Sequence, residues 1–66
     1  MTQPQATPQQ YAGTFDFYAD GRAVLDDLTA KFAGPIWHAD ADERTRRIAW
    51  REVIEHIHAR IAEAAR

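Results

Sequence analysis

Residues 50–64 read WREVIEHIHARIAEA and carry the clearest structural pattern in the chain. Its apolar residues recur at three-, four- and seven-residue steps, which places them on one face of an α-helix. We call this face the apolar stripe; it consists of Trp50, Val53, Ile54, Ile57, Ile61 and Ala64. The pattern predicts a helix from about Ala41 to Glu63, roughly 34 Å long at 1.5 Å per residue.

The residues before the stripe indicate how this helix begins. Asp40 is suited to the N-cap position and Glu43 follows three residues later, an acidic variant of the capping box. Only residues 35–39 separate this helix from the preceding predicted one, and a connection this short makes consecutive helices antiparallel neighbours.

A shorter helix is predicted before the connector. Thr14, Asp16 and Asp20 are all plausible N-caps. An early start would place Gly21 inside the helix at a cost of about 1 kcal/mol, so we expect the regular part at residues 21–33 with Asp20 as its cap. Gly34 and the proline after it end the helix. Its expected inner face is Leu25, Leu28 and Phe32, with Val24 beside them.

Residues 1–14 are predicted to be an extended or disordered arm, and residues 15–66 the helical domain. Pro4 and Pro8 disfavour helix at the residues before them, and the surrounding threonines and glutamines have little to bury. Phe15, Phe17 and Tyr18 are expected to fold back on the exposed end of the long helix. The predicted fold is therefore all-α: an antiparallel helical hairpin with an N-terminal arm.

Size and composition favour association with another chain. A chain of 66 residues forms one small domain, whose core rarely supplies more than about 3–5 kcal/mol. It has no cysteine, so disulfides and thiolate metal sites are excluded. The long stripe also exceeds what the shorter helix can cover. We therefore expect a homo-oligomer, a complex with a larger protein, or both.

Charge and hydropathy argue against other environments. A net charge of −2 makes general nucleic-acid binding an unfavourable interpretation. No apolar run approaches the roughly 18 residues of a membrane span. The N-terminal residues lack a charged start and an apolar core, so a secretory signal is not expected.

No catalytic, cofactor-binding or metal-binding set is predicted. His56 and His58 lie about 200° apart around a helix and cannot share a metal within one chain. Glu55 and His58 have the Glu-x-x-His spacing of di-iron bundles, but they point away from the stripe and the further ligands are missing. There is no glycine-rich phosphate loop and no arrangement of nucleophile, histidine and carboxylate. We therefore expect a protein that is not an enzyme and needs no cofactor.

The basic residues at the start of the long helix have two interpretations. Positive charge there opposes the helix dipole, so helix propensity does not explain it. In the structural interpretation, Arg47 pairs with Glu43 and Arg51 pairs with Glu55 at four-residue spacing. In the functional one, arginines grip an acidic partner or a phosphate backbone. Arginine and tryptophan are enriched at binding hot spots, so the predicted partner-binding residues are Trp37, Arg44, Arg46 and Ile48.

Three segments carry a family resemblance: residues 21–28 (GRAVLDDL) with Phe32, residues 35–37 (PIW) and residues 51–57 (REVIEHI). The pattern resembles small uncharacterised proteins of tailed bacteriophages and prophages. Members often carry glycine just before the arginine of the second helix, where this chain has Trp50, which indicates a bulky contact. The resemblance implies a phage setting and brings no activity and no functional residues.

These observations lead to one functional expectation and two alternatives. We expect a phage protein that acts by protein–protein contact, as a virion-associated or assembly accessory component in the host cytoplasm or the virion. The first alternative is a counter-defence protein or other host-directed inhibitor or regulator, and the second is an auxiliary nucleic-acid-binding protein.

Overall fold

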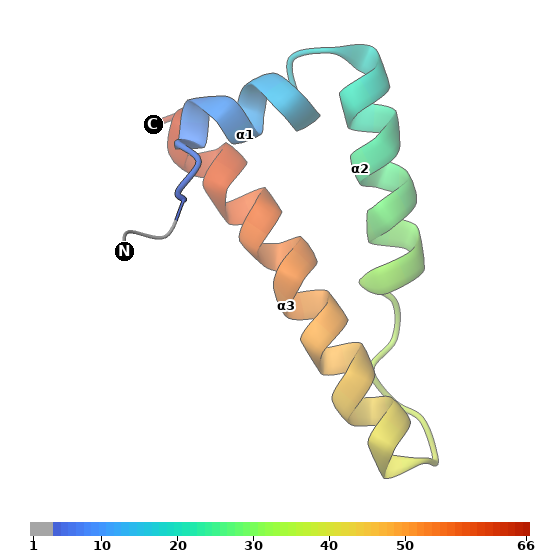
Figure 1. The fold of residues 1–66 in the computed structure, drawn as a ribbon. Helices are drawn as coiled ribbons and strands as arrows, with labels where there is room; N and C mark the ends of the chain where they lie inside the picture. Colours follow the sequence, from blue (N-terminus) through green and yellow to red (C-terminus); the bar gives the residue numbers. More distant parts are fainter. Residues whose placement is uncertain (1–3) are drawn as a thin grey trace.

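The computed structural model describes residues 4–66 and contains three helices in them. They are α1 (Pro8–Phe15), α2 (Ala19–Phe32) and α3 (Ala41–Ala64). The prediction of an all-α fold is confirmed. Helices α2 and α3 run in opposite directions and splay apart, and α1 closes the open end, so the three form the sides of a triangle (Figure 1).

The prediction of an arm over residues 1–14 is wrong from Pro8 onward, and its first three residues lie outside the described part. The Thr7 hydroxyl accepts a hydrogen bond from the Gln10 amide at 3.2 Å, and the Gln10 side chain accepts one from the Thr7 amide at 2.7 Å. Pro8 occupies the first helical turn, where a missing N–H costs nothing. This reciprocal capping box starts α1, and the helix then packs on the C-terminal half of α3.

Helix α2 begins two residues earlier than predicted. Its N-cap is Tyr18, which makes no side-chain capping bond, and Asp20 lies in the first turn instead, where the helix dipole favours an acid. Gly21 is therefore inside the helix. A Cβ at this position would overlap the carbonyl oxygen of Thr14 at the end of α1. The glycine that weakens α2 is what lets the two helices approach.

The expected contact of Phe17 and Tyr18 with the long helix is also wrong. Both side chains are exposed, and their rings stack edge-to-face with centroids 4.9 Å apart. They lie in the turn between α1 and α2, which carries them away from α3. Helix α1 covers the end of α3 in their place, with Phe15 half-buried.

Helix α3 agrees with the prediction to within one residue at each end. The Asp40 carboxylate accepts a hydrogen bond from the Asp42 amide at 2.9 Å, as an N-cap should. The second half of the predicted capping box does not form. The Asp40 amide donates to His38 Nδ1 at 3.0 Å, and Glu43 bonds to arginines instead.

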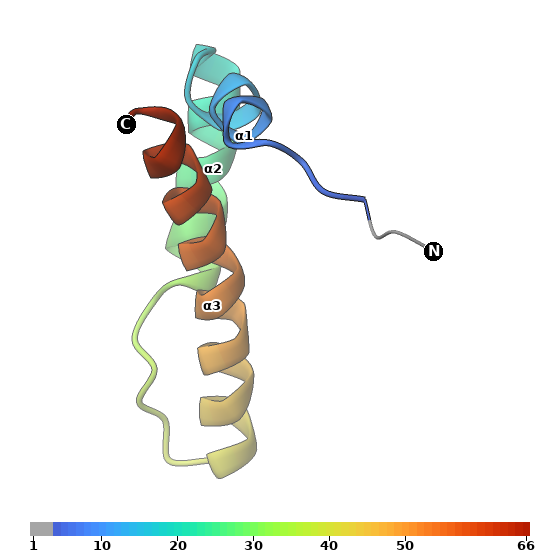
Figure 2. The same cartoon turned by 90° about the vertical axis from the view of Figure 1, so that its left-hand side faces the viewer.

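The molecule is a thin plate with a very small core. Its extents are 39 × 35 × 20 Å, and the helices overlap when the plate is seen from the side (Figure 2). The radius of gyration is 13.8 Å, against about 11 Å expected for a folded chain of this length. Among the described residues, only Leu25 and Ile54 are buried apolar side chains. A closed hairpin with a shared core is therefore not confirmed.

Candidate interaction surfaces

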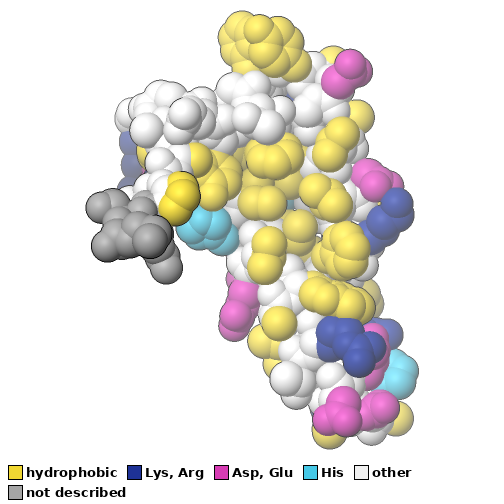
Figure 3. All heavy atoms as spheres, in the orientation of Figure 1, with side chains coloured by type: hydrophobic (Ala, Val, Ile, Leu, Met, Phe, Trp, Pro, Cys, Tyr) yellow, Lys and Arg dark blue, Asp and Glu magenta, His cyan; other side chains and the backbone are white. Residues whose placement is uncertain are grey.

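A groove between α2 and α3 carries most of the apolar stripe. It has a volume of about 270 Å³ and is lined by Leu28, Phe32, Trp50, Val53, Ile54 and Ile57, which we call the apolar groove. Hydrophobic side chains also gather between α2 and α3 on the face seen in Figure 3. Phe32 and Trp50 meet edge-to-face across the groove, with ring centroids 5.5 Å apart.

The stripe is only partly covered within the chain. Ile54 is 4% exposed, whereas its neighbour Val53 is 61% exposed and Trp50 is 36% exposed. Ile57 and Ile61 are half-buried. The sequence thus located the apolar face correctly, but half of the groove remains open to solvent.

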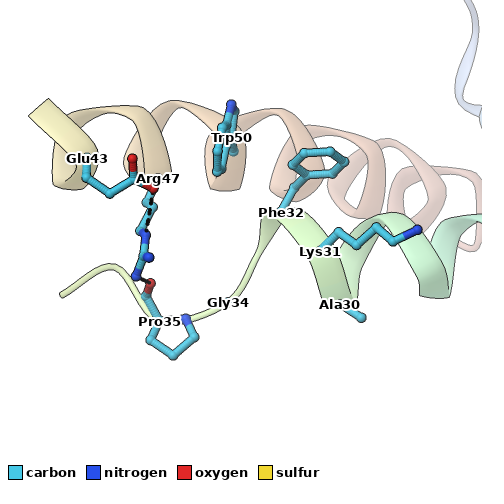
Figure 4. Close-up of a pocket in the computed structure, with 8 residues that line it drawn as sticks. All are labelled: Ala30, Lys31, Phe32, Gly34, Pro35, Glu43, Arg47 and Trp50. Carbon is cyan, nitrogen blue, oxygen red and sulfur yellow. Dashed lines mark hydrogen bonds and ion pairs between the residues drawn. The ribbon is translucent and has the colours of Figure 1, made fainter. Parts of the chain in front are cut away.

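A second, more polar depression of about 230 Å³ continues from the apolar groove, sharing Phe32 and Trp50 with it. Figure 4 shows Arg47 reaching from α3 to the connector at its other end. Arg47 donates to Glu43 at 3.2 Å and to the carbonyl oxygens of Pro35 and Trp37 at 3.3 and 3.2 Å. The predicted pair of Arg47 with Glu43 is confirmed, and the arginine also anchors the connector.

The predicted partner-binding residues divide into two groups. Trp37 is 75% exposed, and the Arg44 guanidinium carbon lies 5.0 Å from its ring centroid. Arg44 also donates to the carbonyl oxygens of His38 and Ala39 at 2.6 and 3.4 Å. The tryptophan is therefore held outward by an arginine that is itself fixed by the backbone. We call Trp37 and Arg44 the connector patch.

The other two predicted residues lie on different sides of α3. Ile48 is exposed one turn after Arg44 on the same side of α3. Arg46 pairs with Glu43 at 2.9 Å. Its helical spacing places it on the same side of α3 as Val53. The structure therefore joins Trp37 with Arg44 and separates Arg46 from them.

Two of the three histidines, His56 and His58, make contacts between helices. The Tyr11 hydroxyl lies 3.4 Å from His56 Nε2, and the Thr29 hydroxyl lies 3.1 Å from His58 Nε2. His56 thus faces α1 and His58 faces α2, as their separation around α3 requires. In the part of the chain that the structure describes, no group of three histidine or acidic residues could hold a metal ion.

One set of contacts was missed by the sequence reasoning. The Arg60 guanidinium donates to the Ala6 carbonyl at 2.8 Å and lies over the Tyr11 ring, 5.7 Å from its centroid. Together with His56, these groups line a polar depression of about 360 Å³ where the N-terminal segment meets α3. The available signal was the capping box at Thr7, which marked a helix start before Tyr11.

The comparisons with known proteins return no relative. No family model matches this chain, and no curated protein or solved structure matches it either. None of the helices in residues 4–66 is both long and apolar enough to cross a lipid bilayer.

Proposed function

We propose that this protein works by protein–protein contact and that the connector patch is its docking contact. The observation that carries the proposal is Trp37, an aromatic side chain that is three-quarters exposed and fixed by Arg44. A large ring held in place before binding loses little conformational entropy when a partner covers it. Tryptophan and arginine are also the side chains that most often dominate binding energy at interfaces.

The dimensions of the other candidate surfaces also favour a protein partner. The apolar groove and the depression beside it have volumes of about 270 and 230 Å³, below the 300–1,000 Å³ typical of small-molecule pockets. The depression of about 360 Å³ beside Arg60 falls within that range, but its Tyr11, His56 and Arg60 side chains already bond to one another or to the backbone. Contact with a protein surface therefore suits the chain better than binding of a small ligand.

Nucleic-acid binding is less well supported. Arg44 bonds to connector carbonyls, Arg46 and Arg47 bond to Glu43, and Arg51 bonds to Glu55 at 3.0 Å. Bonds to acidic partners reduce the charge that these arginines offer to phosphates. With a net charge of −2, the chain has little general attraction for a polyanion.

The resemblance to small phage proteins specifies the proposal further. We place the protein as an accessory component of a phage particle or of its assembly. A host-directed inhibitor would use the same connector patch on a host protein. The two roles differ in the partner recovered with the protein, which is a phage particle or assembly intermediate in the first and a host protein in the second.

The test is sedimentation of tagged protein with phage particles from producing cells. We expect the wild-type chain to sediment with particles or assembly intermediates. Trp37→Ala should weaken this association about 30-fold, as loss of a hot-spot side chain does. Phe17→Ala is the matched control, because Phe17 is also 75% exposed but lies in the turn between α1 and α2. Wild-type protein absent from particles, or Trp37→Ala sedimenting like wild type, would contradict the proposal. Recovery with a host protein instead would favour the inhibitor.

A further inference from the structure

We propose that the apolar groove is the seam of a symmetric dimer, in which the groove of a second copy of this chain covers Trp50 and Val53. This inference rests on the proposed function only in taking protein contact as the way the chain works, and it uses a different surface. Three features of the molecule carry it: the exposed apolar side chains, the single layer of helices and the chemistry of the groove.

Large apolar side chains of the groove are left exposed. The chain exposes 5308 Å², whereas a folded protein of 7.5 kDa exposes about 4,200 Å². Part of the excess belongs to residues 4–7, which are exposed and precede α1. The groove contributes through Phe32, Trp50 and Val53, which are 37%, 36% and 61% exposed. A stable interface takes roughly 800 Å² from each partner, so a second copy covers these side chains together with the surface around them.

The arrangement of the helices shows which layer is missing. Folded domains place two layers of secondary structure around a core. Helices α2 and α3 lie side by side in one layer, and α1 crosses only one end of it (Figures 1 and 2). Helices α2 and α3 therefore have no second layer over the groove within one chain. A second copy placed face to face supplies it.

The groove is suited to a copy of itself. All six of its lining residues are apolar, so the groove itself brings no charge into an interface. The stripe on α3 is long and straight, which allows two α3 helices to pack side by side about a two-fold axis. A second copy is also available wherever the chain is made. A fold with only two buried apolar side chains among its described residues needs such a partner from the start.

The first test measures the mass of the protein in solution. Sedimentation equilibrium of the wild-type chain should give twice the 7.5 kDa chain mass, with dissociation on dilution. Val53→Asp should raise the dissociation constant roughly a thousandfold, because a two-fold interface loses the contact twice. Ile48→Asp is the matched control on the far side of α3 and should leave it unchanged. A monomer or a trimer of wild-type protein would overturn the proposal, as would equal effects of the two variants.

A second test does not depend on a destabilising variant. The chain has two tryptophans, so Trp37→Phe leaves Trp50 as the only indole and Trp50→Phe leaves Trp37. On raising the concentration through the association range, the emission of Trp50 should shift to shorter wavelength as the groove is covered. The emission of Trp37 should stay unchanged. A shift confined to Trp37, or none at Trp50, would assign association to another surface.

The two proposals fail separately. A monomer that still loses particle association through Trp37→Ala would overturn the dimer and leave the proposed function standing. A dimer that sediments with no particle and binds no host protein would overturn the proposed function and leave the dimer standing.

Discussion

Replacement of Gly21 by alanine tests how α1 packs on α2. In most helices this substitution stabilises the helix, because the helix propensity of alanine is about 1 kcal/mol more favourable than that of glycine in a helix interior. Here the added Cβ would overlap the carbonyl oxygen of Thr14, and a Cα–Cβ bond directed at backbone cannot rotate out of the way. Gly21→Ala should therefore destabilise the protein.

The magnitude follows from two opposing terms. Forcing an extra carbon into a packed site costs typically about 1–3 kcal/mol. Subtracting the gain in helix propensity leaves a net loss of up to about 2 kcal/mol. For a chain of this size, each kcal/mol lowers the melting temperature by about 4–8 °C.

Gly13→Ala is the matched control. Gly13 lies in α1, and a Cβ at that position would meet no atom within 4 Å. The same substitution should therefore stabilise by up to about 1 kcal/mol. Urea denaturation followed by circular dichroism at one protein concentration measures both variants. If Gly21→Ala stabilised the chain as much as Gly13→Ala does, α1 would not approach α2 as described.

Three further changes test other parts of the fold. Ile54→Ala truncates a buried side chain and should lower the free energy of unfolding by about 2–5 kcal/mol. Ile48→Ala changes an exposed side chain and should lower it by less than about 0.5 kcal/mol. Equal losses of the two variants in urea denaturation would contradict the assigned helix face. Thr7→Ala removes the cap of α1 and should speed amide exchange in that helix about fivefold, while exchange in α3 is unchanged. Arg47→Gln should lower the free energy of unfolding by about 1–2 kcal/mol and make the connector sensitive to proteolysis, because the connector carbonyls lose their donor. Arg51→Gln loses one surface ion pair, so it should lower the free energy of unfolding by only about 0.3–0.5 kcal/mol and leave proteolysis unchanged.

The long helix was predictable because its signals are local. Asp40 marks the start of α3, and the period of the stripe from Trp50 onward marks its course. The ion pairs of Arg47 and Arg51 followed from four-residue spacing alone. Each of these features depends on residues within a turn or two of one helix.

Helix α1 was not predicted, although part of its signal is also local. Thr7 and Gln10 form a capping box around Pro8, but the polar, proline-containing composition indicated an arm. An eight-residue helix is also marginal by itself in water. Its persistence depends on Tyr11 meeting His56 and Arg60, residues that lie far along the chain.

The connector patch was predicted only in part for a similar reason. The residue types at Trp37 and Arg44 indicated a binding surface. Their stacking follows from the path of the connector, which turns back so that the His38 carbonyl accepts from Arg44. Helical spacing separates Arg46 from this contact, since it lies two residues from Arg44 on another face of α3.

The position of α3 and its apolar face are predictable from the amino-acid sequence, because caps and periodicity depend on a few neighbouring residues. Which part of that face is covered depends on how the other helices pack on it. Val53 and Ile54 are adjacent members of one stripe, yet one is 61% exposed and the other 4%. The hydrophobic effect has no direction of its own, so it drives burial wherever another element is present. Helices α1 and α2 both pack on α3, with Leu28 of α2 beside Ile54 in the groove, and their positions depend on close approaches such as that of Thr14 to Gly21.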